Sequence, residues 1–464
     1  MYEFTPKIGL QNVKLIVYNV IMRRSALKDI DTWYEREISK PLIIRGARQV
    51  GKSTLVRLFC ESKGIHLIEM NLEIERLSTV NKDDFSLQEV LDEIQFKKKT
   101  KIKNNSVIFF DEIQESPKLL KYLRYFYEQA PHLKIIAAGS LLEIALKTED
   151  FSFPVGRVEF YHLGPMNFQE FLWATNNVFL DEKLLAFEFS EALHLEAIKA
   201  LKHFFYVGGM PEVVKKFVET KSLIEIRPLQ KQLIQSYQAD FPKYNRRINV
   251  SRIERIFASL AHNIGEKIIY TKIDSESVSR DIKRVVELLI DARVILPCFH
   301  SAGNSPPLSG ESDDRIYKTY FLDIGLLGAM LNIDLNEIEM EIGTSFNFKG
   351  KLAEQFVAQH LSYMNDASSP PSLYYYLRDK GSQKAEIDFL FDLNRNIVPI
   401  EVKASKSGHL KSLQLFCKDK KSRTAIKTSL KEFNKIENFI PGMTTLFEIP
   451  LYAINYINTN SFDE

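Results

Sequence analysis

The chain has 464 residues, more than one hydrophobic core normally serves, so two to four domains are expected. Hydrophobic residues make up 45% and charged residues 26%, as in ordinary globular proteins, and the formal net charge is +2. This balance excludes a global field that would steer the protein to nucleic acid, so such binding needs a local basic patch. No apolar run reaches membrane-spanning length and no signal-peptide pattern opens the chain, which predicts a cytoplasmic protein without a membrane partner. The three separated cysteines predict free thiols: Cys60, Cys298 and Cys417.

The first two hundred residues alternate short β-rich runs with helical patterns. We predict strands at 41–46, 65–72, 106–112 and 133–140, three of them nearly continuous apolar runs. Such runs are typical of parallel strands that are covered on both faces. Because amphipathic segments lie between them, we predict an α/β domain built on a parallel sheet.

The middle of the chain is largely helical, from residue 182 to 236 and again around 252–265. The segment 277–300 then predicts an amphipathic helix that begins at Ser279, followed by a short strand. A second strand at 315–323 follows a loop rich in Gly, Pro and Ser. Helix, strand, long loop and strand together predict a winged-helix domain with a long wing.

The last third begins with a helical pattern at 348–364. Three strand-like runs follow, and a second helix is predicted from Ser407. The runs lie at 372–379, 385–393 and 396–405.

One loop fits the phosphate-binding pattern G-x-x-x-x-G-K-[ST] without departure, at residues 46–53. Its glycines let the backbone N–H groups face the phosphates, Lys52 reaches the β- and γ-oxygens, and the Ser53 hydroxyl joins the Mg²⁺ shell. The side chains of Arg48 and Gln49 need not take part. A chance match is disfavoured, because a strand precedes the loop and a helix, with its positive end at the phosphates, follows it. We predict that ATP is bound by Gly46, Gln49, Val50, Gly51, Lys52, Ser53 and Thr54.

A second element follows some sixty positions on, where four apolar residues precede Asp111 and Glu112. A buried strand that ends in this pair suits ATP hydrolysis: Asp111 holds the Mg²⁺ water shell and Glu112 orients the attacking water. The alternative is an acidic pair that merely ends a strand. Ser140, at the end of another predicted strand, is placed to sense the γ-phosphate. Arg157 is either an arginine finger or a surface arginine paired with Glu159.

Acidic residues and a lysine gather near the C-terminus. Asp388 and Glu401 lie on runs that a turn near Asn394 can pair as a hairpin, and Glu401 and Lys403 share one strand face. Two carboxylates on one face are costly unless a hard cation sits among them. We predict a Mg²⁺ or Mn²⁺ site at Asp388 and Glu401, where Lys403 activates water for phosphodiester attack. A solvent-facing salt bridge between Glu401 and Lys403 is the alternative.

Several segments resemble, in the same order, AAA-like P-loop ATPases of prokaryotes over residues 31–173. They are "IIRGARQVGKSTL", "VIFFDEIQ", "AAGSLLEIAL" and "GRVEFYHLGPMNFQEFL". The resemblance extends over nearly the whole chain, to the group that joins such an ATPase to a C-terminal domain once of unknown function, through "YVGGMPEVV", "ARVILP" and "YFLDIGL". It implies ATP binding and hydrolysis, Arg157 as the arginine of the motif, and winged-helix character at 251–330.

The C-terminal part resembles the PD-(D/E)XK nuclease fold, through "AEIDFL" and "PIEVKAS". The resemblance implies that Glu354, on the preceding helix, is a further metal ligand beside Asp388 and Glu401, with Lys403 as the motif lysine. Fold alone does not establish cleavage.

The fold prediction is therefore an α/β protein of four segments. These are an N-terminal extension at 1–30, an AAA-like P-loop ATPase domain at 31–205, a helical and winged-helix region at 206–335, and a restriction-endonuclease-like α/β domain at 336–464.

Two functions stay open. In the first, an ATPase switches a DNA-handling module that cleaves. Arg280, Lys283 and Arg284 either contact phosphates there or form an ordinary solvated basic face. In the second, a regulatory ATPase binds protein partners and its nuclease-like domain is inert. The intact phosphate loop and the pair Asp111–Glu112 disfavour a third reading, a binding module that needs no nucleotide. Oligomers, and an Arg157 that acts in a neighbouring subunit, are compatible with both open functions.

Overall fold

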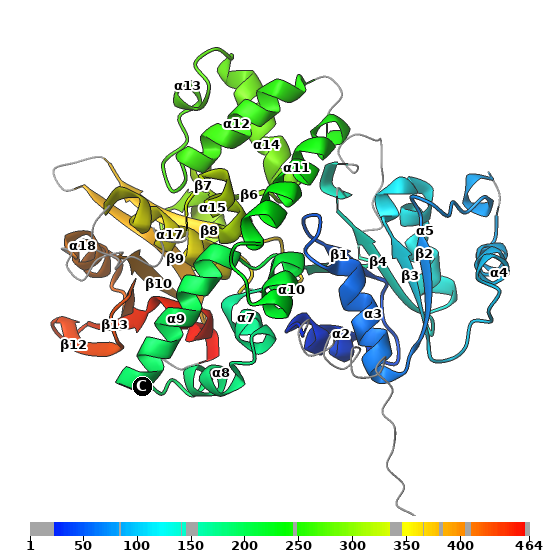
Figure 1. Cartoon of the computed structure of the whole chain (residues 1–464), viewed down its shortest axis with the longest axis horizontal. Helices are drawn as coiled ribbons and strands as arrows, with labels where there is room; N and C mark the ends of the chain where they lie inside the picture. Colours follow the sequence, from blue (N-terminus) through cyan, green and yellow to red (C-terminus); the bar gives the residue numbers. More distant parts are fainter. Residues whose placement is uncertain are drawn as a thin grey trace, which may run out of the picture.

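The structure is a computed structural model, and Figure 1 shows its course. It describes residues 23–82, 85–140, 142–144, 156–244, 248–334, 346–364, 366–379, 384–403 and 410–459. A parallel sheet with its helices lies on one side of the molecule in this view (blue to cyan), and a larger mixed sheet lies on the other (yellow to red). The helices of the middle region connect them.

The N-terminal sheet has five parallel strands in the order β2-β3-β4-β1-β5. The four predicted strands are confirmed, and the sequence missed β5. Their bounds are β1 (Leu42–Arg45), β2 (His66–Asn71), β3 (Ser106–Asp111), β4 (Lys134–Gly139) and β5 (Glu159–His162). Because all strands run the same way, the ends of β1, β3 and β4 meet at one edge, where the phosphate loop lies.

Alternation along β1 shows how helices cover both faces of this sheet. Leu42 and Ile44 belong to a core shared with α2 and α3, whereas Ile43 belongs to a core shared with α4 and α5. These helices are α2 (Ala26–Tyr34), α3 (Lys52–Lys63), α4 (Leu87–Lys98) and α5 (Pro117–Gln129). The predicted boundary at residue 30 falls inside α2, whose Ala26 and Ile30 are buried.

Helices dominate the described residues from 168 to 330. They are α7 (Phe168–Ala174), α8 (Val178–Leu185), α9 (Glu191–Val207), α10 (Pro211–Thr220), α11 (Ile226–Tyr244), α12 (Val250–His262), α13 (Tyr270–Ile273), α14 (Ser279–Asp291) and α15 (Ile324–Met330). As predicted, α14 begins at Ser279. It buries Ile282, Val285, Val286 and Leu289, the spacing of one helical face, and it packs against α12.

The second sheet has eight strands in the order β12-β13-β11-β10-β9-β8-β6-β7. They are β6 (Ile295–Ser301), β7 (Ser312–Phe321), β8 (Leu373–Arg378), β9 (Ala385–Leu393), β10 (Asn396–Val402), β11 (Thr424–Ser429), β12 (Asn434–Ile440) and β13 (Thr444–Pro450). The hairpin β6–β7, predicted as a wing, is part of this sheet, because β6 pairs in parallel with β8 at Cys298 and Leu373. The boundary predicted at 335 therefore divides strands that belong to one sheet. The sequence could not show this, because no local pattern indicates a pairing between strands so far apart.

The C-terminal segment returns to the helices of the middle region. Helices α17 (Phe346–Ser362) and α18 (Lys411–Lys420) pack on the eight-stranded sheet. The 3₁₀ segment η4 (Leu451–Thr459) packs against α8 and α9, where the Tyr456 hydroxyl donates to Asp181 Oδ1 at 2.7 Å. One hydrophobic core consequently extends from α2 to η4.

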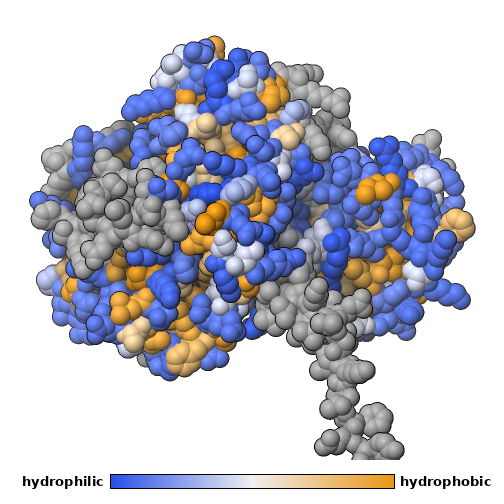
Figure 2. Space-filling view, viewed as in Figure 1, coloured by the Kyte–Doolittle hydropathy of each residue, from blue (hydrophilic) through white to orange (hydrophobic). Residues whose placement is uncertain are grey.

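The surface seen in Figure 2 is mostly hydrophilic, with apolar residues in small groups. Among the described helices, none has the length and apolar character needed to cross a bilayer. All three cysteines are buried and unpaired, as predicted.

Candidate functional site: a phosphate loop and a carboxylate–lysine cluster

Glycine is required at two positions of the loop that joins β1 to α3. Gly46 has a φ of 154°, and a Cβ there would lie 2.2 Å from the carbonyl oxygen of Leu163. Gly51 has a φ of 92°, in the region that favours glycine. Pro211 of α10 would lie 3.5 Å from a Cβ at Gly51. The path of the loop therefore depends on the backbone angles of its two glycines. The loop lies between Leu163, which follows β5, and Pro211 of α10.

Lys52, the first residue of α3, carries a buried ammonium group. Its Nζ donates to the carbonyl oxygens of Gly46 at 3.1 Å and of Ala47 at 2.8 Å. Burial lowers the pKa of Lys52 to about 8, although the charges of Glu112 and Asp111 act in the opposite direction. A phosphate at this loop would supply the negative charge that offsets the burial.

The ends of β3 and β4 bring three predicted residues next to the loop. The Ser53 hydroxyl donates to Asp111 Oδ2 at 2.6 Å, and burial raises the pKa of Asp111. Two oxygen donors side by side fit a hard cation such as Mg²⁺. Glu112 Oε2 accepts from Gln114 Nε2 at 2.6 Å and from Ser140 Oγ at 3.3 Å. The predicted group of Ser53, Asp111, Glu112 and Ser140 is thus assembled around one point.

An open cavity of about 400 Å³ lies over the loop. Its size suits a nucleotide. Residues of the loop, α3, the end of β3 and α10 line it: Arg48, Gln49, Gly51, Lys52, Ser53, Thr54, Arg57, Glu112, Pro211, Glu212 and Lys215. The contribution of α10 links "YVGGMPEVV" to the nucleotide site, which the sequence did not predict.

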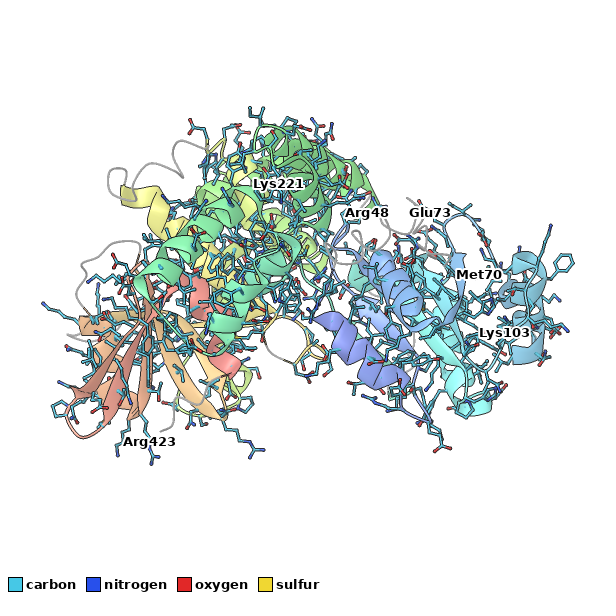
Figure 3. All side chains as sticks on the ribbon, turned by 60° about the horizontal axis from the view of Figure 1, so that its bottom comes forward. Arg48, Met70, Glu73, Lys103, Lys221 and Arg423 are labelled. Carbon is cyan, nitrogen blue, oxygen red and sulfur yellow. The ribbon has the colours of Figure 1, made fainter. Side chains whose placement is uncertain are left out.

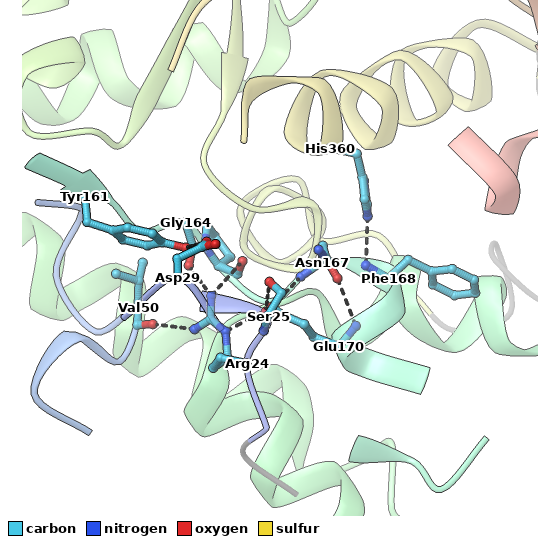
Figure 4. Close-up of polar contacts among 11 residues, drawn as sticks. Arg24, Ser25, Asp29, Val50, Tyr161, Gly164, Asn167, Phe168, Glu170 and His360 are labelled. Carbon is cyan, nitrogen blue, oxygen red and sulfur yellow. Dashed lines mark hydrogen bonds and ion pairs between the residues drawn. The ribbon is translucent and has the colours of Figure 1, made fainter. Parts of the chain in front are cut away.

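Arg24 holds the phosphate loop from the segment that precedes α2 (Figure 4). Its guanidinium donates to the carbonyl oxygens of Val50 at 2.9 Å and of Gly164 at 2.8 Å. It also pairs with Glu170 Oε2 at 3.0 Å, where the two side chains are 5% and 2% exposed. Glu170 caps α7 together with Asn167. The sequence analysis did not identify Arg24. The Asn-x-x-Glu capping box predicts where α7 begins, but it does not show that its glutamate, Glu170, binds Arg24.

Arg157 lies far from this cavity within its own chain. It precedes β5, whose first residue pairs with Leu42 at the start of β1. In a parallel sheet that position is at the edge opposite the phosphate loop. Arg157 is exposed and pairs with Glu128 at 2.8 Å, whereas Glu159 pairs with Arg36. The structure therefore brings Arg157 neither to the phosphate loop of the same chain nor to Glu159.

The predicted C-terminal hairpin is confirmed, and it places two carboxylates side by side. Strands β9 and β10 are antiparallel and paired at Phe389 and Ile400, so Asp388 and Glu401 are neighbours. Asn394 and Arg395, with φ of 51° and 65°, form the turn. Asp388 Oδ2 accepts the backbone N–H of Val402 at 2.8 Å.

The helix carboxylate Glu354 joins this group from α17. It accepts from the Tyr320 hydroxyl on β7 at 3.2 Å. Burial, and next the charge of Asp388, raise the pKa of both Glu354 and Glu401, and burial raises that of Asp388. The cluster consequently favours protons or cations.

Two lysines supply positive charge within the cluster. Lys403 Nζ lies 2.5 Å from Glu401 Oε1, so the salt bridge of the alternative is present; the Glu401 side chain is 9% exposed and the Lys403 side chain 25% exposed. Lys318 of β7, 4% exposed, lies 2.5 Å from Glu386. Burial opposes its charge, yet the attraction of Asp388 and Glu354 leaves the pKa of Lys318 raised. The sequence missed Lys318, since β7 was assigned to a different domain.

Within the described ranges, no three His, Cys, Asp or Glu side chains are arranged to hold a metal ion. Glu354, Asp388 and Glu401 therefore share a cluster, but their present placement does not form a coordination site. One oxygen, Glu401 Oε2, is buried without a hydrogen-bond partner there.

Family models match three parts of the chain. Residues 39–172 match an AAA domain, 198–337 match a domain of unknown function (DUF8612), and 349–452 match another (DUF4143). Together with the parallel sheet and the phosphate loop, the first match makes the N-terminal region a P-loop ATPase domain of the AAA class. The other two matches carry no activity in their descriptions.

A curated relative is an uncharacterised protein of Methanocaldococcus jannaschii, 29% identical over 200 residues, which are 43% of this chain and 40% of the relative. The match thus spans about two fifths of that relative's length. A Walker-type ATPase of Pyrococcus abyssi is 17% identical, covers 71% of this chain and 99% of its own, and has a TM-score of 0.44. The RuvB Holliday junction branch migration motor of Thermotoga maritima is 15% identical, covers 62% and 89%, and has a TM-score of 0.27.

Proposed function

We propose that this protein is a Mg²⁺-dependent ATP hydrolase whose nucleotide cycle changes how its C-terminal module is presented to DNA. The observation that carries the ATPase is that Lys52, Ser53 and Glu112 line one cavity at the carboxyl edge of a parallel sheet, where Asp111 accepts a hydrogen bond from Ser53.

Each residue has a distinct role in hydrolysis. Lys52 and the loop N–H groups bind the β- and γ-phosphates. Glu112, held by Gln114 and Ser140, orients a water whose oxygen forms a bond to the γ-phosphorus. The bond from that phosphorus to the β–γ bridging oxygen breaks, so ADP and phosphate leave. Ser53 and Asp111 would hold Mg²⁺, which would neutralise the charge of the phosphates.

Contacts between the regions support switching. Glu143, just after β4, accepts from Arg293 at 3.1 Å. Asp323, which follows β7, accepts the backbone N–H of Gly209 at 2.6 Å, two residues before Pro211 of α10, which approaches the phosphate loop. Helix α17 carries Glu354 of the cluster, and its His360 accepts the N–H of Phe168 at 2.9 Å. These three sets of contacts connect the nucleotide site with the large sheet, so a movement at the site can be transmitted to that sheet through them.

DNA is the proposed substrate of the C-terminal module, and phosphodiester hydrolysis is its proposed chemistry. The helix α17, the strands β8 to β10, the helix α18 and the parallel strand β11 support the nuclease-like assignment. Arg280, Lys283 and Arg284 of α14 are exposed, as phosphate contacts require. Lys403 would orient the attacking water beside Glu401.

A second candidate is favoured by Lys318. This buried lysine sits among Glu354, Asp388 and Glu386 and already compensates their charge. In that case the C-terminal cluster is structural, and the ATPase regulates a protein partner. The two candidates share the nucleotide site and differ in the chemistry of the cluster.

A first experiment with purified protein tests the nucleotide site that both candidates share. Phosphate release from ATP is measured for the wild type, Lys52→Ala and Glu112→Gln, with the exposed Lys101→Ala as the matched lysine control. We expect losses of roughly 10²-fold or more in the first two variants and none in the control. Glu112→Gln should still bind ATP. Full turnover in Lys52→Ala would overturn the ATPase proposal.

The same preparations are incubated with linear, circular and branched DNA and with Mg²⁺ or Mn²⁺, with and without ATP. Cleavage that is lost in Lys403→Ala, and that ATP changes in the wild type but not in Lys52→Ala, supports the nuclease. Turnover of ATP without cleavage of any DNA overturns the nuclease and leaves the regulatory candidate.

A further inference from the structure

Arg48 is a residue of the phosphate loop whose side chain contacts a different part of the fold. It lines the cavity beside Lys52 and Glu112. Figure 3 shows Arg48 where the N-terminal sheet meets the helices of the middle region. Its guanidinium forms an ion pair with Asp240 of α11.

Helix α11 holds Arg48 at two points. The Tyr237 hydroxyl donates to the carbonyl oxygen of Arg48 at 2.6 Å, and Asp240 binds the guanidinium. Tyr237 is 2% exposed and the Asp240 side chain is 4% exposed. The Arg48 side chain is 30% exposed and faces the cavity. The carboxylate is thus fixed within the protein, and the arginine is the partner that can turn toward a ligand.

The other end of α11 is hydrogen-bonded to the segment that precedes α10, the helix that lines the cavity. Gln230 is fully buried, and its amide donates to the carbonyl oxygens of Tyr206 at 2.8 Å and of Val207 at 2.9 Å. Arg227 donates to the carbonyl oxygen of Gly325 at 3.1 Å, next to Asp323. Asp240 lies ten positions after Gln230 in the helix, about 15 Å along its axis. Helix α11 therefore connects the nucleotide cavity with the segment that follows β7, where Asp323 and Gly325 lie.

We propose that Arg48 contacts the γ-phosphate of ATP, and that this phosphate draws the Arg48 guanidinium away from Asp240. A guanidinium matches phosphate oxygens in a bidentate geometry, and the γ-phosphate offers more negative charge than one carboxylate. ADP lacks this group and leaves the pair in place. Helix α11 then reports whether ATP or ADP is bound. This inference rests on the proposed ATPase.

The competing interpretation is a pair that only stabilises the contact between α11 and the loop. The two differ in nucleotide preference. A structural pair affects ATP and ADP alike, because both occupy the same loop. A γ-phosphate contact affects ATP alone.

The test measures dissociation constants for a non-hydrolysable ATP analogue and for ADP, each with Mg²⁺, by calorimetric titration. For Arg48→Ala we expect the analogue to bind about tenfold or more weakly, from the loss of a charge-assisted hydrogen bond, and ADP to change less than twofold. Arg48→Lys should keep part of the preference. Arg36→Ala removes an exposed ion pair elsewhere and serves as the matched arginine control.

Asp240→Asn provides a variant with the opposite sign. It releases Arg48 without removing it, so the analogue should bind a few-fold more tightly while ADP is unchanged. Hydrogen exchange of α11 in the wild type should rise with the analogue and not with ADP. Equal changes for both nucleotides in Arg48→Ala, or no gain in Asp240→Asn, would overturn the proposal. Lys52→Ala distinguishes a failure of this inference from a failure of the proposed ATPase. If Lys52→Ala binds both nucleotides as tightly as the wild type does, the ATPase proposal is wrong.

Discussion

The two ends of the chain each bury charged side chains, but they compensate them differently. At the phosphate loop, Lys52 donates to backbone carbonyl oxygens, and burial lowers its pKa to about 8. At the C-terminal cluster, the carboxylates face Lys318 and Lys403, and the pKa of Lys318 is raised. The first site is arranged for an anion from outside the chain, and the second carries its own cations.

This difference explains why two complete sequence motifs support the activities proposed for them unequally. A phosphate loop is defined by its backbone path, which Gly46 and Gly51 enforce locally. A carboxylate cluster depends on what other strands bring to it. Lys318 arrives from β7 and changes the charge balance of Asp388 and Glu401. A motif that is complete in sequence can thus be altered by a residue outside it.

The largest expected effect comes from removing the positive charge that compensates the carboxylates of the C-terminal cluster. Lys318→Met leaves buried carboxylates without this counter-charge, so we expect the free energy of unfolding to fall by roughly 3–5 kcal/mol. Urea denaturation at pH 7.5 measures the change. If the cluster is a metal site, Mn²⁺ restores part of the loss.

The matched control is Lys134→Met, which removes a different buried lysine, on β4 of the N-terminal sheet, whose Nζ donates to Ser39 Oγ at 3.0 Å. It should also destabilise the protein, but Mn²⁺ should not restore it. A loss below about 1 kcal/mol in Lys318→Met would contradict the assigned role of Lys318.

A pH dependence of intermediate size sharpens the N-terminal side of the comparison. The Lys52 ammonium loses its proton as the pH rises through about 8. Affinity for ATP should therefore be level from pH 7 to 8 and then weaken by up to about tenfold per pH unit. Lys52→Arg should bind independently of pH over this range, because arginine stays charged. A wild-type affinity that is level to pH 9 would contradict the lowered pKa.

The protein without nucleotide should respond in the opposite direction. The pKa of Lys52 is lower in the folded chain than the unfolded value of 10.5. The unfolded chain then binds more protons between pH 8 and 10.5, so this lysine adds stability as the pH rises through that window.

The smallest expected effect concerns Arg157. Its pair with Glu128 is exposed, so Arg157→Ala should change the free energy of unfolding by less than about 0.5 kcal/mol. ATP turnover should stay within twofold of the wild type at every protein concentration. A loss of turnover that grows with concentration would instead identify Arg157 as a finger that acts on a neighbouring chain.

Local patterns predicted much of the fold. The four apolar strands of the N-terminal sheet, the start of α14 at Ser279 and the hairpin β9–β10 all follow from periodicity and turn residues. The strand β5 was missed because its four residues are mostly half-buried and lack an apolar run. The strands β11 to β13 were likewise not predicted.

Sequence by itself determined the phosphate loop, because glycines, lysine and serine at fixed spacing dictate a local backbone path. It also determined the hairpin that pairs Asp388 with Glu401, since its turn is short and local. The tertiary structure alone decided the contacts of Arg24, Arg48 and Lys318, whose partners come from distant elements. Such pairings depend on which elements pack together, and that choice is made by hydrophobic contacts between elements that lie far apart in the sequence.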